Sequence, residues 1–63
     1  MNVRTESYEF AHGRKPRGFG AWAFKINGQL KFFDGLYGEA LMKAKAFARE
    51  ELRDPHAVIT VQS

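Results

Sequence analysis

The sequence contains no cysteine, only two histidines and two prolines, and no long hydrophobic run. The lack of cysteine excludes disulfide bridges and thiolate zinc sites. No window approaches the roughly 20 apolar residues that a membrane-spanning helix needs. The first residues also lack the apolar core of a signal peptide. We therefore expect a cytoplasmic protein without a membrane partner.

The two histidines, His12 and His56, give little support for catalysis or metal binding. Metal sites usually have three or four protein ligands, and no group of residues in this sequence has that spacing. Catalysis needs polar groups that converge in a cleft. The glycines at positions 13, 18 and 20 do not fit the nucleotide-binding loop G-x-x-x-x-G-K-[ST]. We expect no enzyme activity, and no catalytic residue, metal or cofactor.

The length of 63 residues predicts one small domain, residues 1–63. A chain of this length buries only about 60% of the surface that its unfolded form exposes, so its stability is marginal. Six Phe, two Tyr and one Trp provide large side chains for a core. Self-association would add further buried surface, and both a monomer and a homodimer fit the sequence.

Positive charge is concentrated in the first half of the chain. Residues 1–33 contain six Lys and Arg against two Glu, whereas residues 34–63 contain four against five acidic residues. A polyanion is the natural partner of a basic surface. A net charge of +3 would also serve solubility alone.

The first predicted element is a strand over residues 5–12. These residues alternate at period two, with Tyr8 and Phe10 on the same side, as in a half-buried strand. Residues 13–20 follow with three glycines, a proline and three cations. This composition predicts an exposed loop.

A hairpin is predicted at Asn27-Gly28, which is a strong turn signal. A two-residue loop would pair Phe24 with Lys31 and mix the faces, whereas a three-residue loop pairs Phe24 with Leu30. We expect the three-residue loop, because burial of one face specifies the register. The predicted core face then carries Trp22, Phe24, Leu30 and Phe32, and the predicted outward face carries Ala21, Ala23, Lys25, Lys31 and Phe33.

A helical pattern follows the hairpin. It predicts a helix that begins near Leu36–Gly38, ends at Arg53 and packs on the sheet. The step from Asp54 to Pro55 stops the helix. Residues 57–61 are rich in β-branched side chains and predict a last strand. The stripe that faces the sheet consists of Ala40, Leu41, Ala44, Phe47, Ala48 and Leu52.

The predicted fold is a two-layer α+β domain of order β-β-β-α-β. Its sheet is built on an antiparallel hairpin, and one helix packs on one face. The crossover through the helix makes the short C-terminal strand parallel to the third strand. We expect this last strand to lie beside the first.

Short motifs in the basic loop resemble two kinds of nucleic-acid-binding sequence. RGFGAWAF at residues 17–24 resembles the ribonucleoprotein octapeptide of RNA-recognition motifs, [RK]-G-[FY]-[GA]-[FY]-[ILV]-x-[FY], and cold-shock domains carry a similar run. In those families, aromatic residues at the third and fifth positions stack on bases. Here these positions are Phe19 and Ala21. RKPRG at residues 14–18 resembles the start of an AT-hook.

The longest resemblance covers about residues 14–49. A basic segment, G-x-W-x-x-x-I from Gly20 to Ile26, a turn, a strand with aromatic residues and a helix look like the three-strand-plus-helix DNA-binding domains. These are the plant ethylene-response-factor domain and the arm-binding domain of phage-type integrases, in which the sheet enters the major groove. The resemblance implies nucleic-acid contacts from Arg14, Arg17, Lys25 and Lys31.

The residues themselves point to the same function, a small nucleic-acid-binding domain whose nucleic-acid type stays open. Cations neutralise phosphates, glycines permit close backbone approach and exposed aromatic rings stack on bases. One alternative is a protein–protein interaction module of phage or mobile-element type that binds an acidic partner. Another is a homodimerising protein without catalytic role. The predicted binding residues are Arg14, Lys15, Arg17, Phe19, Lys25, Lys31 and Phe33.

Overall fold

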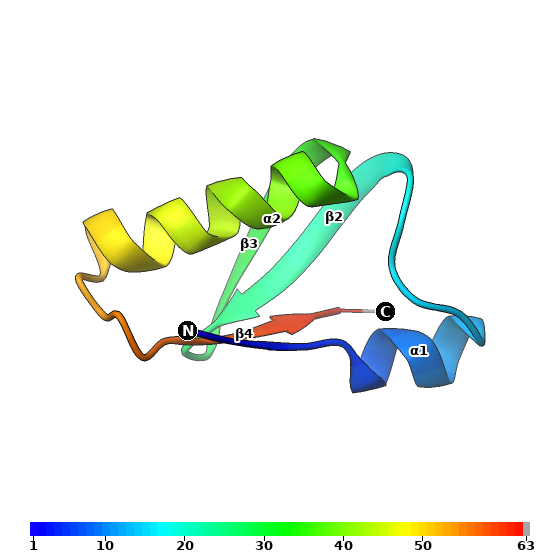
Figure 1. Cartoon of the computed structure of the whole chain (residues 1–63), viewed down its shortest axis with the longest axis horizontal. Coiled ribbons are helices and arrows are strands. Elements are labelled where there is room, and N and C mark those ends of the chain that lie inside the picture. The colour runs from blue at the N-terminus through cyan, green and yellow to red at the C-terminus, as the bar shows by residue number, and fades with distance from the viewer. Residues whose placement is uncertain (63) are drawn as a thin grey trace.

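The computed structural model describes residues 1–62 and has an α+β fold, as predicted. Figure 1 shows the helix α2 above the sheet and the helix α1 beyond the ends of β1 and β4. The elements in chain order are β1 (Asn2–Arg4), α1 (Glu6–His12), β2 (Phe19–Ile26), β3 (Gln29–Leu36), α2 (Tyr37–Ala46), the π-helical turn η1 (Phe47–Glu51) and β4 (Val58–Val61). The hairpin, the helix after it and the C-terminal strand are therefore confirmed.

The four strands form one mixed sheet in the order β1-β4-β2-β3. β1 pairs with β4 in parallel, and β2 pairs with β3 and β4 in antiparallel fashion. The last strand does lie beside the first one, as expected. That first strand is Asn2–Arg4, however, and not residues 5–12.

The predicted strand over residues 5–12 is wrong, because this segment forms the helix α1. The rings of Tyr8 and His12 stack with their centroids 4.1 Å apart, and residues four apart in sequence meet in this way on a helix. Gly13 ends the helix in the left-handed conformation, with φ of 68°. Phe10, which suggested the alternation, is 94% exposed.

The predicted three-residue hairpin loop is also wrong. Ile26 pairs with Gln29 across a two-residue turn made of Asn27 and Gly28. Asn27 has φ of 50° and Gly28 has φ of 88°. A type I′ turn needs positive φ at both of its central residues, and its twist matches that of the strands. The turn chemistry therefore decided the register against the apolar pattern.

The shorter turn moves every side chain of β3 to the opposite face from the predicted one. Phe33 packs against the core, with its ring centroid 6.2 Å from that of Phe24. The Nζ atom of Lys31 lies 4.9 Å from the ring centroid of Phe47, on the helix side of the sheet. Lys31 and Phe33 are therefore not outward. The face away from the helices instead carries Leu30, Phe32, Asp34 and Leu36.

The core lies between the sheet and the helices. The predicted helix stripe is confirmed, since its three alanines are fully buried and its larger residues pack around the core. Tyr8 of α1 and Trp22 of β2 belong to the same cluster. The large side chains that are fully buried are Phe24, Ile26, Ile59 and Val61. No helix among residues 1–62 has the length and apolar character needed to cross a membrane.

Candidate nucleic-acid interface

The beginning of β2 has a free edge. All eight residues of β2 pair with β3, but β4 pairs only with Phe24–Ile26. The N–H of Gln62 donates to the carbonyl of Ala23 at 2.9 Å. Backbone groups two residues apart in a strand point to the same side. The N–H and C=O groups of Ala21 therefore point to the same edge as the Ala23 carbonyl, beyond the position of Gln62. No strand of the described chain occupies this part of the edge.

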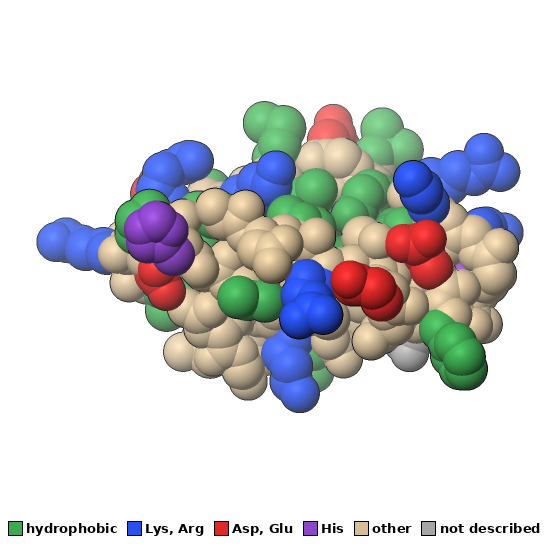
Figure 2. All heavy atoms as spheres, turned by 60° about the horizontal axis from the view of Figure 1, so that its bottom comes forward, with side chains coloured by type: hydrophobic (Ala, Val, Ile, Leu, Met, Phe, Trp, Pro, Cys, Tyr) green, Lys and Arg blue, Asp and Glu red, His purple; other side chains and the backbone are tan. Residues whose placement is uncertain are grey.

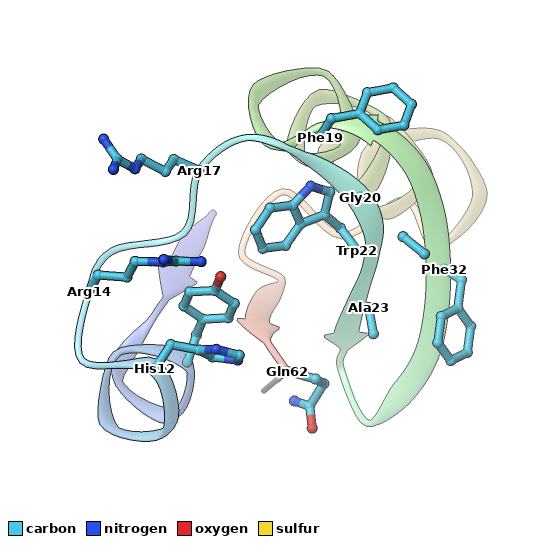
Figure 3. A pocket seen from close by; sticks show the side chains of 11 residues that line it. His12, Arg14, Arg17, Phe19, Gly20, Trp22, Ala23, Phe32 and Gln62 are labelled. Atoms are coloured by element: carbon cyan, nitrogen blue, oxygen red, sulfur yellow. The ribbon is translucent and has the colours of Figure 1, made fainter.

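A pocket of about 430 Å³ lies at this free edge (Figure 3). The helix α1 and the loop of residues 13–18 form one wall, and β2 forms the other. α1 contributes Tyr8 and His12, and the loop contributes Arg14 and Arg17. The remaining large side chains around the pocket are Phe19, Trp22, Phe32 and Gln62.

Aromatic rings connect the two walls of this pocket. Tyr8 stacks on His12 and lies 5.4 Å from Trp22, measured between ring centroids. Trp22 in turn contacts Tyr37 at 5.0 Å, edge to face. Burial raises the pKa of the Tyr37 hydroxyl. The stack joins α1, β2 and α2, so the position of α1 depends on Trp22.

The basic loop is held at its end by Gly18. The carbonyl of Gly18 accepts two hydrogen bonds, one from Nε1 of Trp22 at 3.1 Å and one from the backbone N–H of Tyr37 at 2.9 Å. Gly18 has φ of 89°, which an L side chain rarely adopts. These contacts fix the point at which the loop enters β2.

Pro16 anchors the middle of the same loop. It is buried, whereas its neighbours Lys15 and Arg17 are exposed. In Figure 3 the guanidinium of Arg14 extends toward the pocket, and the side chain of Arg17 points away from it. The ion pairs of residues 1–62 join Arg4 to Glu6 and Arg49 to Glu50, so the loop cations have no carboxylate partner there. They are available to an anion from outside.

The structure brings together three of the seven predicted binding residues. Arg14, Arg17 and Phe19 all line the pocket, and Phe19 is 82% exposed. Lys15 is exposed in the same loop but does not line the pocket. The other three lie elsewhere: Lys25 on the open face of the sheet, and Lys31 and Phe33 on the helix side.

Sequence reasoning missed Tyr8 and His12 because it assigned residues 5–12 to a strand. A strand would have placed these two side chains on one face but far apart. Their spacing of four residues, followed directly by Gly13, was the signal for a short helix. Trp22 was assigned to the core, where it lies, but it also lines the pocket.

On the face viewed in Figure 2, Lys and Arg side chains do not form one continuous patch, because they lie at both ends and in the middle with carboxylates between them. No group of three or more His, Cys, Asp or Glu in the described part of the chain could hold a metal ion. The local grouping at the pocket is therefore more informative than the net charge.

Comparisons with protein-family models, with curated proteins and with solved structures find no match for this chain.

Proposed function

We propose that this chain binds single-stranded nucleic acid, without catalysis, at the pocket beside the free edge of β2. The observation that carries the proposal is the grouping of two cations without a described carboxylate partner, Arg14 and Arg17, with the exposed rings of His12 and Phe19. Guanidinium groups bind phosphate through paired hydrogen bonds. Aromatic rings and guanidinium planes stack on bases.

An unpaired strand suits this pocket better than a duplex. The volume of about 430 Å³ and the exposed ring of Phe19 at the rim would take bases that are free of their own stack. The backbone N–H and C=O of Ala21, which face the edge, offer one donor and one acceptor to a base.

Trp22 is the single tryptophan of the chain and lines the pocket, so its fluorescence reports binding directly. We would titrate the protein with short single-stranded DNA, RNA and duplex DNA at two salt concentrations. Single strands should shift the Trp22 emission at lower concentration than the duplex. If two phosphates are neutralised, the logarithm of affinity should fall with the logarithm of salt with a slope of roughly −1.4.

The double variant Arg14→Ala/Arg17→Ala should lose most of this affinity and most of its salt dependence. Lys43→Ala/Arg49→Ala is the matched control, because it removes the same charge from exposed positions on the α2–η1 segment. Equal loss of affinity in both double variants would show that net charge alone binds the oligonucleotide. Absence of any Trp22 response at low salt would contradict the proposal.

A second candidate is a protein partner, and the free edge at Ala21 favours it. An extended acidic peptide could add to β2 as a further strand, with its carboxylates beside Arg14 and Arg17. Polyglutamate separates the two candidates, because it carries charge without bases. Tighter binding of polyglutamate than of single-stranded oligonucleotides of equal charge would favour the peptide.

A further inference from the structure

One face of the β2–β3 hairpin is left uncovered by the rest of the chain. The helix α2 packs on the other face, where Trp22 and Phe24 lie, and Tyr8 of α1 contacts Trp22 on that side. On the uncovered face, Leu30, Phe32 and Leu36 are 50%, 65% and 50% exposed. Neighbouring apolar side chains that are exposed in this way indicate an interaction surface.

We propose that a second copy of the chain covers this face and forms a two-fold symmetric, sheet-to-sheet dimer. The first argument is the order of the paired rows along the hairpin. Phe32 lies opposite Ala23 in the middle row. The next outward-facing row on one side holds Lys25, and the next outward-facing row on the other side holds Asp34.

This arrangement is complementary to itself. A two-fold axis along the middle row, across the strands, exchanges the two outer rows. It places Lys25 of each copy against the row that holds the partner's Asp34, and it brings the two Phe32 rings together at the axis. Ala23, beside Phe32, leaves room for the ring of the other copy. Within one chain, Lys25 and Asp34 form no ion pair with a described residue.

A stable interface buries about 800 Å² per partner, which is about a fifth of the 4298 Å² surface of the chain. A 63-residue domain has a small core, and the dimer would add the apolar burial that it lacks.

The proposed interface shares Phe32 and Ala23 with the lining of the pocket, so the dimer would cover that side of it. In Figure 3, His12 and Arg14 lie on the other side of β2 from Phe32, and this side of the pocket would stay open in the dimer. This inference does not depend on the ligand of the pocket.

The first test measures the molar mass by light scattering and sedimentation from micromolar to millimolar concentration. The wild-type chain should reach twice its mass of 7.2 kDa. Phe32→Ser should remain a folded monomer, with an unchanged Trp22 emission maximum as proof of folding. Phe10→Ser is the matched control, because Phe10 is 94% exposed on α1 and lies outside the proposed interface. It should dimerise normally.

The second test reverses the two charges. Lys25→Asp alone and Asp34→Lys alone should each raise the dimer dissociation constant roughly tenfold or more, because each creates facing like charges. The double reversal K25D/D34K should restore the dimer. An equimolar mixture of the two single variants should form heterodimers, because each then supplies the charge that the other needs.

A wild-type chain that stays monomeric at every concentration would overturn the proposal. A dimer that Phe32→Ser leaves intact would also overturn it and would point to another contact, such as the outer edge of β3. A monomer that associates only with an added oligonucleotide or peptide on this face would assign the face to that ligand instead. Single charge variants that do not complement one another would rule out the two-fold arrangement.

Discussion

The side-chain amide of Asn27 donates a hydrogen bond to the carboxylate of Asp54 at 2.8 Å. The side-chain amide oxygen of Asn27 also accepts a hydrogen bond from the backbone N–H of Val58 at 3.0 Å. The backbone N–H of Asn27 donates to the carbonyl of Val58 at 3.1 Å. One turn residue thus joins the hairpin to the segment that leads from the helix into β4.

Replacement of Asn27 should lower the free energy of unfolding. Asn27→Gly keeps the positive φ of the turn but removes both side-chain hydrogen bonds, and we expect a loss of about 1–2 kcal/mol. Asn27→Ala should cost about 1 kcal/mol more, because alanine is strained at this φ. Urea unfolding followed by Trp22 fluorescence measures both losses. A glycine variant as stable as the wild type would show that the side-chain hydrogen bonds of Asn27 do not stabilise the fold.

Acid should weaken the same junction. The pKa of Asp54 is lowered from its ordinary value of 3.8, chiefly by the hydrogen bond from Asn27 and also by the backbone N–H of His56. Because the folded pKa lies below the unfolded one, the carboxylate stabilises the fold above pH 3.8. This stabilisation is lost as the pH falls through 3.8 to the folded pKa.

Asp54→Asn should therefore lose less stability than the wild type when the pH is lowered through this range. The measurement is the urea midpoint of both proteins at pH values on either side of 3.8. The other carboxylates are common to both proteins and cancel in the comparison. Parallel pH profiles would contradict the prediction.

Trp22→Phe should destabilise the fold by about 1–3 kcal/mol. The substitution removes the N–H donated to Gly18 and leaves space beside Tyr8. Thermal unfolding followed by circular dichroism measures this loss, since the variant has no tryptophan. Tyr37→Phe is the control, because it keeps the ring against Trp22 and removes only a hydroxyl. Similar losses in both variants would argue against a special role of the indole.

Lys31→Ala tests the position that the structure assigns to this lysine. The loss of its contact with the Phe47 ring should cost about 0.5–1 kcal/mol. Its oligonucleotide affinity should equal that of the wild type, because the side chain lies on the helix side, away from the pocket. A reduced affinity with a smaller salt dependence would show that Lys31 does contact the oligonucleotide.

The elements with strong local signals could be predicted from the sequence. The Asn27-Gly28 turn, the alanine stripe of α2 and the β-branched last strand all lie where they were expected. The register could not be predicted, because Leu30 and Phe32 are apolar. Burial of apolar side chains favours a register in which both of them face the core. These side chains are exposed, and the preference of Asn27 and Gly28 for positive φ determined the pairing.

The candidate site was predicted only on its loop side, with Arg14, Arg17 and Phe19, whereas its aromatic half of Tyr8, His12 and Trp22 was not predicted. Arg14 and Arg17 stand in a run of cations and glycines that reads as a loop in any fold. The aromatic half depends on α1, a helix of seven residues that is held by one buried side chain, Tyr8. Local propensity is weak over so few residues, and the tertiary contact with Trp22 decides the conformation.

β4 lies between β1 and β2 and joins them into one sheet. α1 follows β1 directly, so the place of Tyr8 and His12 beside Trp22 depends on the pairing of β4 with both of its neighbours. The pocket therefore exists only when the whole sheet is assembled, and a ligand that binds there stabilises the complete fold over any partly opened form.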